Sequence, residues 1–233
     1  VVHWPIERAG VIGNPLPGTT VALVPNAEKQ EMRVRGPKVT PGYWRDDAET
    51  ARAFDEFGFY RIGDAGRLLE PDEPQAGIVF DGRVAEDFKL SSGTWVHAGN
   101  LRLRSIYACD PLSTDCVVAG HDRDEIGLLL FPHVGACRDL AGLGEDAPLA
   151  DVLGHPAIRD HIASALATHN AANAASSRRL TRALWLPTPP SIDANEITDK
   201  GYINQRAVLE CRVDAVERLF ADDPEVIRPS AER

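Results

Sequence analysis

The first third of the chain carries short segments rich in strand-forming residues, separated by turn residues. Residues 20–24 and 31–35 are two such segments, and a turn-like polar stretch opening with Pro25-Asn26 separates them. Asp46 and Asp47 precede residues 48–54, as the N-terminus of a helix prefers, so one short helix is expected there. The strands expected in this part are residues 20–24, 31–35, 58–60 and 77–80, the last ending before the turn pair Asp81-Gly82.

Beyond Gly82 the pattern changes to a mixture of apolar strand-length runs and helical stretches. The alanine-rich residues 155–173, with Pro156 near their start, predict a helix. Residues 204–221 carry an apolar stripe at helical spacing, which predicts a closing helix that packs on a core. Strands are expected at 116–119, 126–131 and 183–186, a further helix at 101–107, and a frayed tail from Pro224.

This order, with strands first and mixed elements after them, predicts an α+β chain of two units. We expect a β-rich unit over residues 1–82 and a small, mobile α+β unit over residues 83–233. The chain of 233 residues is long enough for either unit to bury a core.

Composition narrows the classes of partner. The hydrophobic share of 43% and the charged share of 26% are those of a soluble globular protein, and no apolar run approaches the roughly 18 residues of a membrane span. A net charge of −10 argues against nucleic acid, although local amides and single cations can still hold phosphates. No secretory signal is visible at the N-terminus, so the cytoplasm is the expected compartment. Four scattered cysteines without a CxxC pair indicate reduced, buried thiols and no metal site.

Three constellations carry candidate chemistry. Asp64, flanked by Gly63 and Gly66, could accept hydrogen bonds from the vicinal hydroxyls of a ribose, or could stand in a plain connecting turn. Residues 81–96, with a Gly-Arg pair, acids and a Ser-Ser-Gly loop, suit either a linker between rigid bodies or a hairpin with solvated charges. Lys200 lies in a Thr/Asp/Gly loop before the last helix, where it could reach a phosphoryl or carboxylate oxygen, or could simply be solvated.

Together and in this order, the three blocks resemble those of the adenylate-forming family of acyl-CoA synthetases, luciferases and nonribosomal adenylation domains. The segment Pro41-Gly42-Tyr43-Trp44 also matches the family pattern before the ribose-binding Asp. Residues 88–96, and 189–193 leading into 197–205, resemble feruloyl-CoA synthetases in particular. The resemblance covers nearly the whole chain and is to the C-terminal portion of such an enzyme.

The resemblance implies a role for each matched residue. Asp64 would bind the ribose hydroxyls of ATP, and Arg83 would contact the nucleotide beside the hinge. Lys200 would be the catalytic lysine that bridges the carboxylate and the α-phosphate while the adenylate forms. The pantetheine tunnel would be lined by Ser91, Ser92, Gly93, Thr94 and Trp95. ATP, Mg²⁺ and CoA would act as substrates of the parent enzyme, with none tightly bound to this chain.

Several positions depart from the family pattern. Ile62 stands in place of Thr, and Asn100 in place of Glu. Asp199 precedes Lys200 where the wider family has Gly. The family has an acidic residue at the hinge. Its spacing from the Gly-Arg pair places it at Ala85, whereas its spacing from the following glycine, Gly93, places it at Glu86. Glu86 is favoured, and Asp87 remains an alternative.

The family's phosphate loop, acyl pocket and Tyr-Gly-x-Thr-Glu segment would precede Val1. The 1–82 unit would then be the end of the large N-terminal domain, and this chain alone is expected to be inactive without the missing N-terminal part. The expected activity of the parent is an ATP-dependent acid–CoA ligase acting on a hydroxycinnamate such as ferulate. The alternatives are a ligase for another aromatic or medium-chain acid, and a non-catalytic nucleotide-binding or interaction module.

Overall fold

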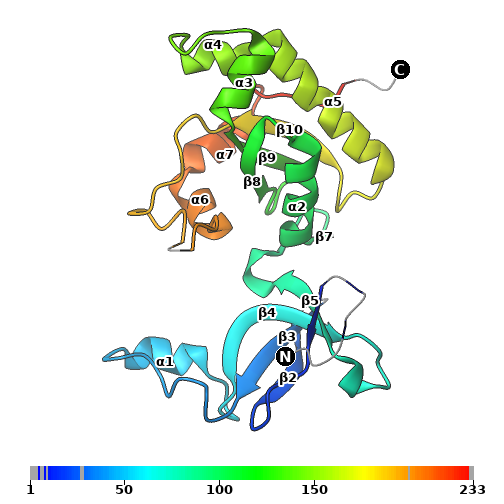
Figure 1. Cartoon of the computed structure of the whole chain (residues 1–233), viewed down its shortest axis with the longest axis vertical. Helices are drawn as coiled ribbons and strands as arrows, with labels where there is room; N and C mark the ends of the chain where they lie inside the picture. Colours follow the sequence, from blue (N-terminus) through cyan, green and yellow to red (C-terminus); the bar gives the residue numbers. More distant parts are fainter. Residues whose placement is uncertain (1–4, 6–7, 9, 27–28, 199, 231–233) are drawn as a thin grey trace. The chain divides into compact units, whose positions relative to one another are not determined.

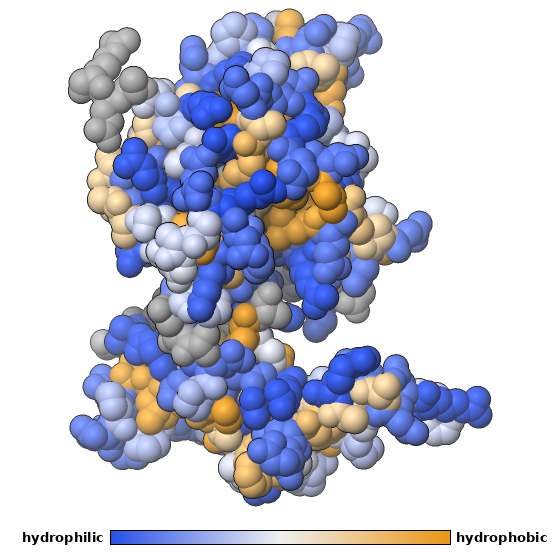
Figure 2. All heavy atoms as spheres, turned by 180° about the vertical axis from the view of Figure 1, so that it is seen from behind, coloured by the Kyte–Doolittle hydropathy of each residue, from blue (hydrophilic) through white to orange (hydrophobic). Residues whose placement is uncertain are grey.

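The computed structural model describes residues 5, 8, 10–26, 29–198 and 200–230. Contacts divide the chain into two compact units, Val1–Ala85 and Glu86–Arg233, each of which is visible in Figure 1. Hydrophilic side chains predominate on the face of each unit seen in Figure 2.

The first unit is built on an antiparallel sheet in the order β1-β5-β4-β3-β2. Met32, Ala65 and Ile78 are buried in its core. Gly66 lies so close to Met32 that an added Cβ would come within 2.6 Å of the sulfur, so the strands pack closely at this point. The elements are β1 (Val11–Gly13), β2 (Thr20–Asn26), β3 (Lys29–Arg35), α1 (Asp47–Ala53), β4 (Tyr60–Leu68), a 3₁₀ turn η1 (Pro74–Ala76) and β5 (Ile78–Arg83).

The second unit contains a hairpin, β6 (Phe88–Lys89) and β7 (Trp95–Val96), and a sheet in the order β10-β9-β8. Strand β9 is antiparallel to β8 and parallel to β10. The sheet strands are β8 (Ser113–Ala119), β9 (Ile126–Pro132) and β10 (Leu180–Trp185). The helices are α2 (Ala98–Cys109), α3 (Val134–Ala141), α4 (Leu149–Gly154), α5 (Pro156–Ala172), α6 (Gln205–Cys211) and α7 (Val213–Phe220).

Side chains of this sheet alternate between two apolar clusters, one on each face. Leu128 and Leu130 of β9 pack with α2 and α5, while Leu129 of the same strand packs with α6 and α7. Because both faces are covered, β9 is an almost continuous apolar run and could be predicted from it. In Figure 1, α2 and α5 lie on one side of the strands, and α6 and α7 lie on the other.

Several expectations from sequence are wrong in detail. Strand β4 runs through Gly63 and Asp64, and β5 runs through Asp81 and Gly82, so neither expected turn is present. Short helices α3 and α4 were not predicted, and α2 is longer than expected.

The expected closing helix is broken at Arg212, where the backbone leaves the helical region at φ −109° and ψ 38°. The tail is not frayed over Val226 and Ile227, which are buried; Ile227 and Ala183 exchange two main-chain hydrogen bonds of 2.8 Å.

The cysteines are free in the described structure. Cys109, Cys116 and Cys137 are buried as expected, whereas Cys211 is exposed. Burial raises the pKa of Cys109 to about 12 and that of Cys137 to about 11, so both thiols stay protonated and unreactive at neutral pH.

Candidate functional site

Asp64 and Arg83 face one another on neighbouring strands of the first unit. They are register partners in β4 and β5, and the Arg83 Nε lies 3.6 Å from Asp64 Oδ1. The pairing of β4 shifts register on both sides of this position, and Gly63 adopts a φ of +76°. A bulge in a paired strand therefore presents Asp64, in place of the connecting turn expected from the sequence.

The surroundings of Asp64 disfavour its negative charge. Its side chain is 31% exposed, and desolvation raises the pKa of the carboxyl above its ordinary value, against the opposing effect of the Arg83 charge. An acceptor and a cation thus lie side by side on neighbouring strands, the combination that a ribose with adjacent phosphates would need.

The two candidate hinge acids differ in how they are held. Glu86 ends a 3₁₀ turn, η2 (Val84–Glu86), and is the first residue of the second unit. The Asp87 carboxylate is 6% exposed and lies 2.8 Å from Nδ1 of His97, the N-cap of α2. Asp87 is therefore fixed inside the second unit.

Gln205, at the start of α6, was not singled out from the sequence, although it joins Glu86 to the sheet. Its buried amide accepts a hydrogen bond from Val118 N–H at 3.1 Å and donates to the Glu86 carbonyl at 3.5 Å. A buried Gln at the start of an amphipathic helix was the available signal, since such a side chain needs polar partners.

Of the predicted tunnel residues, Ser91 to Thr94 form the turn of the β6–β7 hairpin, and Trp95 begins β7. Gly93 has a φ of +81°, its N–H donates to the Leu90 carbonyl at 2.8 Å, and open space surrounds the position of a Cβ. Ser91 N–H donates to the Arg123 carbonyl at 2.9 Å, so the turn is held against a second loop of the unit. Lys89 lies 5.0 Å from the centre of the Trp95 ring in a cation–π contact. Residues 88–96 therefore form a hairpin, whereas residues 81–86 complete β5 and form η2, where the two compact units meet in the sequence.

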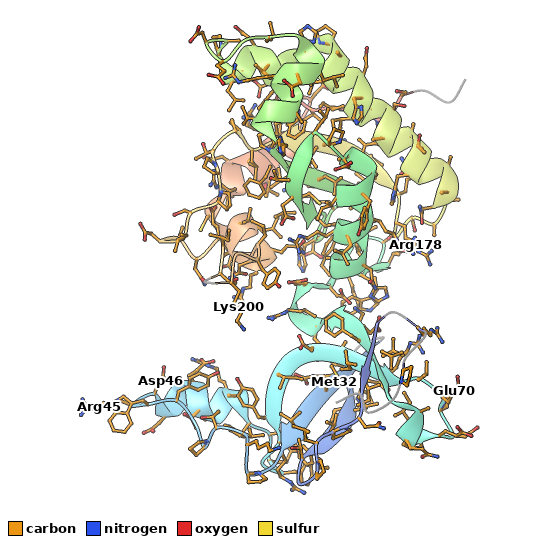
Figure 3. The ribbon with its side chains drawn as sticks, viewed as in Figure 1. Met32, Arg45, Asp46, Glu70, Arg178 and Lys200 are labelled. Atoms are coloured by element: carbon orange, nitrogen blue, oxygen red, sulfur yellow. The ribbon has the colours of Figure 1, made fainter. Side chains whose placement is uncertain are left out.

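Lys200 lies at the end of a small two-stranded loop before α6. Ile197 and Ile203 form an isolated bridge, Thr198 N–H donates to the Tyr202 carbonyl at 2.8 Å, and Gly201 N–H donates to the Thr198 carbonyl at 2.9 Å. Lys200 is exposed, and Figure 3 shows its side chain extending away from α6. Asp199, which departs from the family pattern, lies outside the described residues.

The candidate residues thus fall into two sets. Asp64 and Arg83 meet in the first unit, whereas Glu86, Asp87, the β6–β7 turn and Lys200 belong to the second. Over residues 10–26, 29–198 and 200–230, no group of three or more His, Cys, Asp or Glu side chains is arranged to hold a metal ion. Within the same described ranges, no helix has the length and apolar character needed to cross a membrane.

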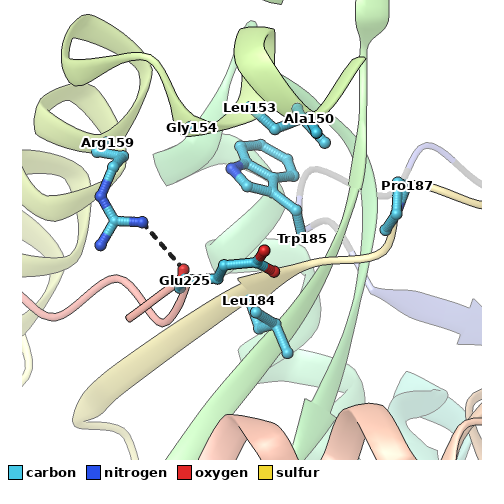
Figure 4. Close-up of a pocket in the computed structure, with 8 residues that line it drawn as sticks. All are labelled: Ala150, Leu153, Gly154, Arg159, Leu184, Trp185, Pro187 and Glu225. Carbon is cyan, nitrogen blue, oxygen red and sulfur yellow. Dashed lines mark hydrogen bonds between the residues drawn. The ribbon is translucent and has the colours of Figure 1, made fainter. Parts of the chain in front are cut away.

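A cavity of about 150 Å³ lies in the second unit, and none of the candidate residues lines it. It is lined by α4, the end of β10 and the C-terminal segment, as Figure 4 shows (Ala150, Leu153, Gly154, Arg159, Leu184, Trp185, Pro187 and Glu225). Arg159 donates to the Glu225 carbonyl at 3.1 Å, and the Glu225 carboxylate pairs with Arg218. Both charges at this cavity are already engaged within the protein.

The chain is similar in sequence to bacterial CoA ligases. It is 27% identical over 226 residues to fadD11 of Mycobacterium tuberculosis, a fatty-acid–CoA ligase by name, covering 96% of this chain and 38% of that protein. It is 27% identical over 219 residues to the long-chain-fatty-acid–CoA ligase FadD15 of the same organism, covering 91% and 34% respectively. The chain therefore spans little more than a third of the length of these relatives. No protein-family model matches the chain.

The fold is also that of adenylate-forming enzymes. The adenylation domain of the carboxylic acid reductase from Segniliparus rugosus, solved with AMP and a co-purified carboxylic acid, matches 87% of this chain and 31% of its own, with a TM-score of 0.66 at 20% identity. The mixed α and β architecture matches the C-terminal part of such domains, so the fold class expected from sequence is confirmed.

Proposed function

We propose that the chain is part of an ATP-dependent acid–CoA ligase. The observation that carries the proposal is the similarity to CoA ligases over 96% of the chain, together with the three motif-bearing sites in their expected order. In the first half-reaction a carboxylate oxygen attacks the α-phosphorus of ATP, taken as its Mg²⁺ complex, and pyrophosphate leaves. In the second, the CoA thiol displaces AMP from the acyl carbonyl.

Each candidate residue has a role in this proposal. Asp64 accepts hydrogen bonds from the ribose hydroxyls, and Arg83 contacts the nucleotide. Lys200 meets carboxylate and phosphate oxygens together and stabilises the charge that builds on the phosphorus. Its exposure at the end of a loop supports this role, because the cation is presented to solvent and not held inside the unit.

The second half-reaction uses other residues of the same unit. Ser91, Ser92, Gly93, Thr94 and Trp95 line the path of the pantetheine arm. We assign the hinge to Glu86 because it is the first residue of the second unit. The open space around Gly93 supports the tunnel assignment.

The acid that we propose is a hydroxycinnamate such as ferulate, on the resemblance of residues 88–96, 189–193 and 197–205 to feruloyl-CoA synthetases. The names of the relatives favour a fatty acid as the second candidate. ATP–pyrophosphate exchange of the full-length enzyme with ferulate, benzoate, octanoate and palmitate separates them. Exchange with ferulate alone supports the first, exchange with a fatty acid supports the second, and ATP binding without exchange on any acid indicates a non-catalytic module.

We also propose that this chain, taken alone, forms neither adenylate nor thioester. A phosphate loop and an acyl pocket would supply the positioning on which most of the rate depends. Pyrophosphate release from the isolated chain that depends on an added acid would contradict this part of the proposal.

A further inference from the structure

A buried ion pair joins three separate segments next to the Lys200 loop. Arg212 Nε lies 2.6 Å from Glu196 Oε1, and Arg212 Nη2 lies 2.8 Å from Glu196 Oε2, so both carboxylate oxygens face the guanidinium. The Glu196 side chain is 1% exposed and that of Arg212 is 20% exposed. The two side chains therefore make a contact of two hydrogen bonds, with the carboxylate buried and the guanidinium partly buried.

The same two side chains also bind main-chain groups of the preceding segment. Glu196 Oε2 accepts a hydrogen bond from Ser191 N–H at 2.8 Å, and Arg212 donates to the Pro189 carbonyl at 3.1 Å. Glu196 N–H donates to the Ser191 carbonyl at 2.9 Å. The contact thus fastens the segment after β10 to the junction of α6 and α7.

Glu196 stands at the base of the loop that carries Lys200. Its carbonyl accepts a hydrogen bond from Asn204 N–H at 2.9 Å, which closes the loop four residues on either side of Lys200. Among the described loop residues 197–203, the hydrogen bonds join one side of the loop to the other. The loop is therefore held at its base by Glu196, and also by Ile203, which is buried in the apolar cluster of α6 and α7.

Burying a carboxylate and a guanidinium costs free energy, and an apolar pair of similar volume often stabilises a protein as well or better. An apolar pair would not fix the orientation of the two segments that carry it, whereas an ionic contact through two hydrogen bonds does. An exposed pair on α6, Arg206 and Glu210, has side chains 74% and 61% exposed and serves no such purpose.

We infer that Glu196 and Arg212 are positioning residues for Lys200, holding its loop at the angle needed for adenylate formation. This inference rests on the proposed function of Lys200. The pair touches neither substrate nor reacting atoms and acts through the loop. A displacement of about 1 Å at a reacting group can lower a rate by about 10²-fold.

The test compares Glu196→Gln, Arg212→Lys and the matched control Glu210→Gln in the full-length enzyme. Pyrophosphate release measures adenylation, and CoA consumption from supplied acyl-adenylate measures thioester formation. We expect Glu196→Gln and Arg212→Lys to lower kcat for adenylation by about 10- to 100-fold with KM for ATP little changed. Thioester formation, and both reactions of Glu210→Gln, should stay within about two-fold of wild type, as expected for sites outside that step.

A double-mutant cycle distinguishes positioning from general damage. If Glu196 acts through Lys200, Glu196→Gln should cause no further loss of adenylation in a Lys200→Ala background. An equal loss in both half-reactions, or the same additional loss in the Lys200→Ala background, would overturn the inference. If Lys200→Ala leaves adenylation unchanged, the proposed function of Lys200 is wrong. This outcome is distinct from one in which Lys200 is required but Glu196 does not act through it.

Hydrogen exchange on this chain keeps the inference testable if Glu196→Gln destabilises the unit. Arg212→Lys retains the charge but cannot make the two-point contact. We expect faster exchange of the Thr198, Gly201 and Tyr202 amides in this variant, with the amides of β9 unchanged. Unchanged exchange in the loop would contradict the inference.

Discussion

Arg83 lies opposite Asp64 across strands β4 and β5, yet its charge does not restore an ordinary pKa to the Asp64 carboxyl, because desolvation dominates and raises it. The folded state therefore disfavours the ionised form. Protonation of Asp64 therefore favours the folded state. Its contribution to the free energy of unfolding is fully present below the ordinary pKa of 3.8 and is lost as the pH rises through the pKa of the folded state.

Asp64→Asn should accordingly raise the thermal stability of this chain at pH 7 while weakening nucleotide binding by the full-length enzyme. The gain in Tm should shrink as pH is lowered toward 4. Calorimetry between pH 4 and 8 measures it, with the exposed Asp72→Asn as the control. A lower Tm for Asp64→Asn at pH 7, or unchanged ATP affinity, would contradict the assignment.

Glu196 should show the opposite dependence on pH. The hydrogen bonds from Arg212 are the largest cause of the lowered pKa of its carboxyl, so the ionised form is stabilised by folding. This stability is present above the ordinary pKa of 4.5 and is lost as pH falls through the folded pKa. Glu196→Gln should lower the free energy of unfolding at pH 7 by about 1–3 kcal/mol. Denaturant titration at pH 7 and at pH 3 should show the difference narrowing, and a difference that grows in acid would rule out this account.

Gly93 should matter to the second half-reaction alone. A bulky side chain there would narrow the proposed pantetheine path and would also be strained at a φ of +81°. Gly142 ends α3 at a φ of +67°, also with open space around it, so Gly142→Val is the matched control for backbone strain. Gly93→Val should slow thioester formation from supplied adenylate and spare pyrophosphate release, whereas Gly142→Val should change neither. Loss of both reactions in Gly93→Val would assign the turn a structural role.

The proposed hinge predicts where a protease will cut. Limited digestion should cleave between Arg83 and Asp87, giving fragments that correspond to the two compact units. Mass spectrometry of the early products identifies the site. Cleavage elsewhere with this stretch spared would argue against a hinge at Glu86.

Much of the fold could be predicted because local pattern and tertiary environment agree. Strand β9 is apolar throughout because both of its faces are covered, and α5 combines alanine-rich sequence with Pro156 in its first turn. A strand was expected only over residues 58–60, and the rest of β4 was missed because Gly63 and Asp64 have turn propensity, which pairing with β3 and β5 overrides.

The break in the closing helix and the contacts of the site residues could not be predicted from the sequence, because they depend on residues far apart in the chain. Arg212 interrupts an otherwise regular apolar stripe, and its partner Glu196 lies sixteen residues earlier in the chain. The resemblance to a family could name Asp64, Arg83 and Lys200. It could not reveal that Asp64 faces Arg83 across two strands or that Glu196 closes the base of the Lys200 loop, since both depend on how distant segments pack.

We propose that Lys200 serves adenylate formation and not thioester formation. The most direct test measures both half-reactions of Lys200→Ala in the full-length enzyme, by pyrophosphate release and by CoA consumption from synthetic adenylate. Adenylation should fall by about 10²-fold or more, as when one transition-state contact is removed. Thioester formation should remain near the wild-type rate, and Lys200→Arg should not restore adenylation because a planar guanidinium cannot replace a compact ammonium. Equal loss of the two half-reactions, or unchanged adenylation, would contradict the claim.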